Sequence, residues 1–149
     1  MKSCPFCNPS IEQAAWLETP GYRAIYNIAP IVSGHSLVIP RKHVTSLLEL
    51  DEAAVAELFQ TARRAAAVLL AAFEGEGFDL SLQDGEAAGQ SVPHLHVHLL
   101  PRKAGDLPEG EDWYEQVLDS GSRPRLPEEE LHTVVQRLRK QTEFTELTR

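Results

Sequence analysis

One long amphipathic helix pattern most constrains the fold of this chain. From Asp51, a residue type that favours helix N-caps, apolar side chains recur at three- and four-residue intervals as far as Phe73. The run Glu74–Gly77 (EGEG) then ends the pattern with two glycines. A single helix of this length needs a broad partner surface for its apolar face.

Strand patterns on both sides of this helix supply that surface. Before it, YRAIYNIAP (22–30) and HSLVIP (35–40) predict a hairpin, with Gly34 in the turn between them. After it, FDLSLQD (78–84) and HLHVHLLP (94–101) predict two further strands, joined by the loop GEAAGQSV. The order of elements indicates an α+β fold in which an antiparallel sheet packs against the long helix.

The carboxyl-terminal third predicts mainly helix. Residues 126–141 carry a proline and acidic residues at the start, basic residues at the end and an apolar face, so they predict a docked C-terminal helix. Residues 112–119 (DWYEQVLD) fit a short helix, and residues 120–125 (SGSRPR) are typical of a mobile connector.

Composition and charge restrict the classes of protein to which the chain can belong. The 149 residues, 42% hydrophobic, suit a single domain spanning residues 1–149. A net charge of -8 lacks the basic footprint of a nucleic-acid-binding protein, which leaves small anionic ligands met by a local site. No apolar run approaches the roughly 18 residues of a membrane span, and no secretory signal is apparent. We therefore expect a cytoplasmic protein without a membrane partner.

Three histidines stand at every second position in SVPHLHVHLLPR (91–102). On a strand, His94, His96 and His98 would share one face, with neighbouring rings about 6.7 Å apart, and the aliphatic residues between them would face the helix. A single such histidine is commonly a solvated polar filler, but three in alternation favour chemistry. Two uses remain open: imidazoles that coordinate a metal ion, or a neutral imidazole that attacks phosphorus or a carbonyl.

A metal site is also indicated by Cys4 and Cys7, which form C-x-x-C at the amino terminus. In a chain without export signals, this spacing favours a metal site or a redox pair over a structural disulfide. Two thiolates leave room for two imidazoles in a tetrahedral zinc site. His43 is a natural third ligand and one histidine of the triad a fourth, although spacing alone does not fix the set.

The stretch QSVPHLHVHLLPR resembles the signature of the histidine triad (HIT) family, His-φ-His-φ-His-φ-φ with φ apolar. With SLQDGEAAG, IVSGH and ELFQTARR, the resemblance extends over residues 20–140 to the fragile histidine triad branch, the dinucleoside polyphosphate hydrolases. The CPFC segment is instead similar to zinc-bearing bacterial members. The resemblance implies a HIT-like fold of about five antiparallel strands, a zinc-binding segment over residues 1–20 and a homodimer.

The resemblance also implies roles for individual residues. The middle histidine of the family motif, His96 here, is the nucleophile that forms a nucleotidyl-histidine intermediate with the α-phosphate of a dinucleoside polyphosphate. His98 would bind the phosphoryl oxygens, and a histidine at this last position, where the family's transferases have glutamine, implies hydrolysis. The remaining implied contacts are the catalytic and substrate-binding Gln90, the substrate-binding Asn27, Gln83 and Ser91, the supporting His35, and a structural zinc ion on Cys4, Cys7, His43 and His94.

Two other functions remain open from the sequence. An adenosine phosphoramidate hydrolase of the same family would use the same nucleophile with an amine as leaving group. A zinc-dependent hydrolase, or a zinc-stabilised binding module, would instead use the triad to coordinate the ion.

Overall fold

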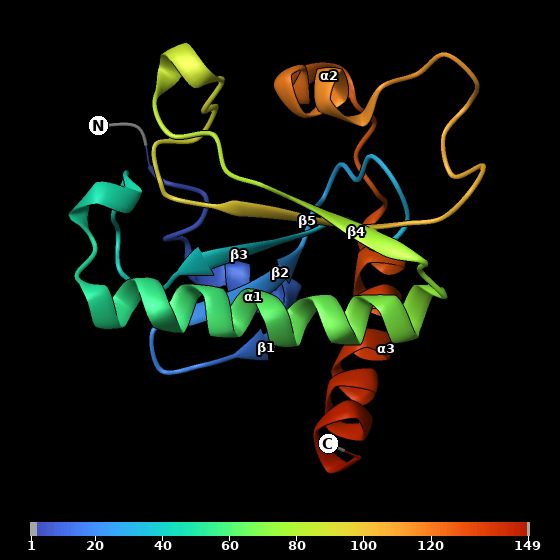
Figure 1. Cartoon of the computed structure of the whole chain (residues 1–149), viewed down its shortest axis with the longest axis horizontal. Coiled ribbons are helices and arrows are strands. Elements are labelled where there is room, and N and C mark those ends of the chain that lie inside the picture. Colours follow the sequence, from blue (N-terminus) through green and yellow to red (C-terminus); the bar gives the residue numbers. More distant parts are fainter. Residues whose placement is uncertain (1–2, 149) are drawn as a thin grey trace.

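A five-stranded antiparallel sheet with one long helix against it organises residues 3–148, which the computed structural model describes (Figure 1). Hydrogen bonds order the strands β1-β2-β3-β5-β4, and every pairing is antiparallel. The strands are β1 (Ala15–Glu18), β2 (Tyr22–Tyr26), β3 (Ser36–Pro40), β4 (Gly77–Ser81) and β5 (Val97–Arg102). The helices are α1 (Glu52–Phe73), α2 (Trp113–Leu118) and α3 (Glu128–Leu147), with short 3-10 helices η1 (Pro9–Ala14), η2 (Leu47–Glu49), η3 (Glu86–Ala88) and η4 (Ser120–Ser122). The predicted α+β class is confirmed.

Helix α1 confirms the predicted amphipathic helix. The Asp51 carboxylate accepts a hydrogen bond from the Ala54 amide at 2.8 Å and so caps the first turn. At the other end Glu74 takes a left-handed conformation, φ 54°, and its amide donates to the Leu70 carbonyl. The buried face of α1 packs against one face of the sheet, around Leu99 of β5.

The β2–β3 hairpin forms where the sequence predicts it, although both strands are shorter than predicted. Strand β2 ends at Tyr26, because the side chain of Asn27 turns back to accept a hydrogen bond from the Ala29 amide. In the turn, Gly34 has φ 95°, and a Cβ atom there would lie 2.5 Å from Cγ of Pro101. Only glycine fits this close approach between the hairpin and β5.

Strand β5 begins later than predicted. Its ladder starts at Val97, so His94 and His96 precede the strand and only His98 lies within it. Continuing the β3–β5 register would place Pro40 opposite Leu95, and proline has no amide to extend the ladder. The Leu95 amide donates instead to the Val44 carbonyl at 2.7 Å.

Two further elements differ from what the sequence predicts. The sequence gives no prediction of strand β1, because three of its four residues, AWL, are buried and show no alternation. Helix α3, predicted over residues 126–141, covers Glu128–Leu147. Its last residues contain no glycine or proline, and Thr142 donates to the Trp16 carbonyl while Arg64 pairs with Glu146, so the helix continues along β1 and α1.

The C-terminal connector is held at several points rather than left free. Figure 1 shows α2 on the side of the sheet away from α1, with the chain from α2 descending past the sheet to α3. Within this connector, Arg123 donates to the Ala29 carbonyl, and the Leu126 amide donates to the Ile28 carbonyl, both at 2.7 Å. No helix within residues 3–148 is long and apolar enough to cross a membrane.

Candidate active site and metal-ligand cluster

A cavity of about 330 Å³ lies on the sheet face opposite α1. His96 and His98 form part of its wall, and α2 contributes Val117. Its volume falls in the lower range of small-molecule sites. The other lining residues are Pro5, Phe6, Ile11, Ala14, Ile25, Tyr26, Asn27, Ile28, Ala29, Leu37, Gly89, Ser91, Val92, Gly121, Arg123 and Arg125.

The tautomer of His96 is fixed by a backbone carbonyl. Nδ1 of His96 lies 2.8 Å from the carbonyl oxygen of His94, and because a carbonyl only accepts, Nδ1 carries the hydrogen. In the neutral ring, Nε2 then holds a lone pair. Since His96 is 5% exposed and lines the cavity, the residue offers a neutral nitrogen nucleophile there.

A second hydrogen-bond chain orients His98. The Ile31 amide donates to Nδ1 of His35 at 3.1 Å, so the hydrogen of the neutral His35 ring is on Nε2. That Nε2–H lies 2.9 Å from Nδ1 of His98, which therefore accepts. The hydrogen of His98 is left on Nε2, where it is a donor beside His96, with the two ring centroids 5.1 Å apart.

Burial keeps these imidazoles neutral. It lowers the pKa of His96 and, with the nearby His96 and Arg123, lowers the pKa of His98 to about 3. The pKa of His35 lies well below its usual value because of burial and then the neighbouring His98, Arg123 and His96. At neutral pH, His96 therefore has a free lone pair on Nε2 while the neighbouring His98 has a hydrogen-bond donor on its own Nε2.

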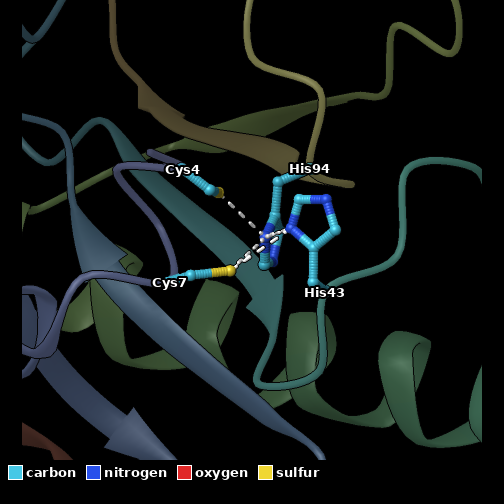
Figure 2. A group of neighbouring side chains, drawn as sticks. All are labelled: Cys4, Cys7, His43 and His94. Carbon is cyan, nitrogen blue, oxygen red and sulfur yellow. Dashed lines mark hydrogen bonds between the residues drawn. The ribbon is translucent and has the colours of Figure 1, made fainter. Parts of the chain in front are cut away.

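Four donor atoms gather beside the cavity, from Cys4, Cys7, His43 and His94 (Figure 2). They lie within 4.8 Å of one another. Nδ1 of His94 is 3.4 Å from Sγ of Cys4, 3.5 Å from Sγ of Cys7 and 3.2 Å from Nδ1 of His43. Nε2 of His94 donates to the Pro40 carbonyl at 2.9 Å, so its Nδ1 has a free lone pair.

This cluster fits a tetrahedral metal ion. Tetrahedral zinc with two sulfur and two nitrogen ligands has S···N edges of about 3.6 Å and an N···N edge of about 3.3 Å, close to the separations found. Within residues 3–148, His94 is the triad histidine that joins the thiols, whereas His96 and His98 bond to a carbonyl and to His35. This arrangement opposes the reading in which the whole triad coordinates one ion.

Phe6 connects the cluster with the cavity. It lies between the two cysteines in the chain, and its ring centroid is 5.5 Å from those of both His94 and His96. Because Phe6 also lines the cavity, the segment that carries the thiols forms one cavity wall. Sequence reasoning identified the cysteines but gave no role to the aromatic residue between them.

The other expected substrate contacts divide into two groups. Asn27 and Ser91 line the cavity, whereas Gln83 and Gln90 lie outside the lining set. Gln83 is buried and donates to the Ser81 hydroxyl.

Gln90 bonds to the backbone around it. Its side-chain oxygen accepts from the Gly85 amide at 2.7 Å, and its nitrogen donates to the carbonyls of Thr45 and Val92 at 3.0 and 3.1 Å. In this structure Gln90 therefore braces the glycine-rich loop that carries Ser91. Arg123 and Arg125, which sequence reasoning missed, line the cavity from a connector that has no motif of its own.

Fold, triad and loop together define a HIT domain protein. Residues 8–105 match the HIT domain family, and the chain belongs to that family. It is 38% identical over 94 residues to the asymmetrical bis(5'-nucleosyl)-tetraphosphatase of Schizosaccharomyces pombe, a match covering 63% of this chain and 52% of the relative. It is 34% identical over 106 residues to the bis(5'-adenosyl)-triphosphatase of Dictyostelium discoideum, covering 71% and 70%. The chain thus spans only about half the length of the first of these relatives.

Among solved structures, a zinc-bound histidine triad family protein from Mycobacterium smegmatis is similar along nearly its whole length. The TM-score is 0.75 at 27% identity, with 99% of this chain and 98% of that chain covered. The HIT-like fold expected from the sequence is thereby confirmed.

Proposed function

We propose that this protein hydrolyses dinucleoside polyphosphates at the α-phosphorus through a nucleotidyl-histidine intermediate on His96. The observation that carries the proposal is the hydrogen bond from Nδ1 of His96 to the His94 carbonyl, which leaves a lone pair on Nε2 of a ring that lines the cavity. The similarity to a bis(5'-nucleosyl)-tetraphosphatase and a bis(5'-adenosyl)-triphosphatase supports this substrate class.

The reaction proceeds in two displacements. Nε2 of His96 forms a bond to the α-phosphorus as the bond to the bridging oxygen breaks, and the rest of the polyphosphate leaves with the electron pair of that bond. Water then attacks the same phosphorus, the P–N bond breaks and the proton lost from water ends in solvent. Nε2–H of His98 donates to a phosphoryl oxygen as charge develops in each step.

Other residues are proposed to position the substrate. Asn27 and Ser91 bind the nucleotide from the cavity wall, and His35 holds the tautomer of His98. Gln83 and Gln90 are proposed as nucleotide and leaving-phosphate contacts, as in the family. For Gln90 this requires its side-chain amide to exchange loop backbone partners for phosphate oxygens.

We propose zinc as the ion held by Cys4, Cys7, His43 and His94, in a structural role. The donor set of two thiolates and two imidazoles suits zinc, and the zinc-bound relative of similar fold supports the choice. When bound, zinc supplies a cross-link between the amino-terminal segment, the chain after β3 and the chain before β5. His96 then carries out the displacement without contact to the ion.

We further propose that residues 1–149 form one HIT domain, located in the cytoplasm. The C-terminal α3 and strand β1 pack into one apolar cluster with the segment matching the family, and η1 and β1 pack into a second cluster with residues of β2 and β3. Thiolate ligands are preserved in a reducing compartment.

We also propose a homodimer that joins two sheets along β4. This strand is an edge of the sheet, and its alternate residues Phe78 and Leu80 are 47% and 40% exposed. An uncovered apolar edge favours pairing with a second strand.

The proposed activity is tested by incubating the zinc-loaded protein with diadenosine tri- and tetraphosphate and with adenosine phosphoramidate. We expect AMP from the polyphosphates, and a loss of at least about 10³-fold in kcat for His96→Ala with the zinc content unchanged. Absence of polyphosphate cleavage by the wild-type protein would reject the proposed substrate class. Full activity in His96→Ala would reject the nucleophile.

A further inference from the structure

The connector between α2 and α3 forms one rim of the cavity. We call residues 121–126 the rim segment. Arg123 fastens it from both sides, because its guanidinium donates to the Ala29 carbonyl and to the Gln116 carbonyl of α2. A further hydrogen bond joins the Leu126 amide to the Ile28 carbonyl. The rim segment is thus attached to α2 and to the loop after β2.

The rim segment also supplies the formal charge of the cavity. Among the lining residues within the described part of the chain, Arg123 and Arg125 are basic and none is acidic. The chain as a whole carries a net charge of -8. A local positive potential in an acidic protein concentrates anions at this wall.

Of the two arginines, Arg125 is available for a ligand. It is exposed, and its guanidinium makes no hydrogen bond or ion pair with any residue from 3 to 148. By contrast Arg102, which follows the triad on β5, is bound to the carboxylates of Asp79 and Asp106 at 2.9 and 2.6 Å. The basic residue nearest the triad in sequence is therefore already paired.

The positive charge of the rim segment acts electrostatically on the last histidine of the triad. Arg123 and His98 line the same cavity, and although burial is the main cause of the lowered pKa values of His35 and His98, the positive charge of Arg123 lowers both further. The guanidinium fork binds phosphate oxygens in pairs, and such charge-assisted bonds are stronger than neutral ones.

We infer that Arg125, on the segment that Arg123 fastens, binds the phosphate chain beyond the scissile bond and selects substrates with an anionic leaving group. The inference rests on the proposed function and deepens it. A dinucleoside polyphosphate presents further charged phosphates past the α-phosphorus, whereas a phosphoramidate presents an amine. The rim segment would bind the first group and have no contact with the second.

Kinetics of Arg125→Ala on both substrate classes tests this inference. For diadenosine triphosphate we expect KM to rise about five- to tenfold with kcat within about twofold, because one charge-assisted contact formed equally in the ground and transition states is lost. For adenosine phosphoramidate we expect KM and kcat within about twofold of wild type. Arg63→Ala is the matched control, since Arg63 is an exposed arginine of α1 outside the cavity lining. Equal effects on both substrates, or no effect on either, would overturn the inference.

Binding separates this inference from the proposed activity. By calorimetry, wild type should bind ADP more tightly than AMP, and Arg125→Ala should remove most of that preference while binding AMP as before. If the protein cleaves neither substrate but shows this pattern, the anion subsite stands and the proposed activity fails. If it cleaves diadenosine triphosphate and Arg125→Ala neither raises KM nor changes the ADP preference, the activity stands and the subsite fails.

Discussion

At the scale of single residues, backbone groups decide what each histidine does. The His94 carbonyl holds the hydrogen of His96 on Nδ1, the Pro40 carbonyl holds that of His94 on Nε2, and the Ile31 amide sets the tautomer of His35. The alternation of the three histidines predicted a reactive face from sequence. It did not predict which backbone groups would be the partners, because these groups come from loops and from the motif itself, and no side-chain pattern identifies them.

The buried His98 makes stability depend on pH. Its folded pKa of about 3 lies below the ordinary 6.5, so between these values the unfolded chain binds more protons and stability falls as pH falls. The contribution of neutral His98 is complete above pH 6.5. The ring of His98 is faced by His96, His35 and Arg123. A positive charge on any of these three groups disfavours protonation of His98.

We therefore expect His98→Gln to flatten the acid side of the stability profile. Between pH 6.5 and pH 5 the wild type should lose roughly 1.6 kcal/mol more than the variant, from the linkage of one proton. Urea unfolding at several pH values measures this difference. His132→Gln, at an exposed position of α3, is the control. Identical profiles for wild type and His98→Gln would show that His98 is not buried as a neutral ring.

At the scale of elements, the CPFC segment links two sites that sequence reasoning treated separately. Cys4 and Cys7 lie in the metal-ligand cluster, and Phe6 between them contacts His94 and His96 and lines the cavity. The segment has no periodic pattern, and its position depends on long-range contacts with the chain before β5. Sequence therefore predicts the ligands but not the wall that they hold in place.

Removal of the metal should accordingly weaken nucleotide binding without abolishing chemistry. For Cys7→Ser or chelated protein we expect the Tm to fall by several degrees and KM to rise at least about threefold, because Phe6 is no longer held. The kcat should stay within about threefold of wild type. Thermal unfolding and steady-state kinetics measure these effects. A kcat reduced to background at saturating substrate, in protein still folded by circular dichroism, would place the ion in the reaction.

The hairpin turn at Gly34 is a second element-scale test. Gly34 and Gly110 both have positive φ, 95° and 88°, but a Cβ at Gly34 would lie 2.5 Å from Pro101, whereas Gly110 faces open space. Gly110→Ala should cost about 1 kcal/mol from backbone strain, and Gly34→Ala at least about 2 kcal/mol more because the turn and β5 must separate. Denaturant unfolding compares the two. Equal losses would mean that the turn does not pack against β5 as described.

At the scale of the whole molecule, the sequence predicted the class of fold and most of its elements. The long helix, the hairpin and the strands flanking the glycine-rich loop follow from local periodicity, and all of them except β4 contribute buried residues to the core. Strand β1 and the end of α3 could not be predicted from local periodicity. Their limits are set by packing against each other, and local sequence contains little of that information.

Assembly also belongs to this scale, and the proposed homodimer gives a direct prediction. Leu80→Lys on the uncovered edge β4 should convert the dimer to a monomer, because a charged edge residue opposes strand pairing. Phe144→Lys, at an apolar residue of α3 that is even more exposed than Leu80, should leave the dimer intact. Sedimentation velocity distinguishes the species. A wild-type protein that is monomeric at all accessible concentrations would reject the dimer, and a dimeric Leu80→Lys protein would reject this edge as its interface.

Trapping of a covalent intermediate is the decisive test of whether His96 attacks the substrate. The zinc-loaded protein is mixed with diadenosine triphosphate, quenched within milliseconds under alkaline conditions that preserve phosphorus–nitrogen bonds, and analysed by peptide mass spectrometry. We expect one adenylyl group on the peptide that contains His96, and none in His96→Ala. An adenylyl group on another residue, or substrate turnover in the wild type without any covalent nucleotide at the shortest times, would rule out His96 as the nucleophile.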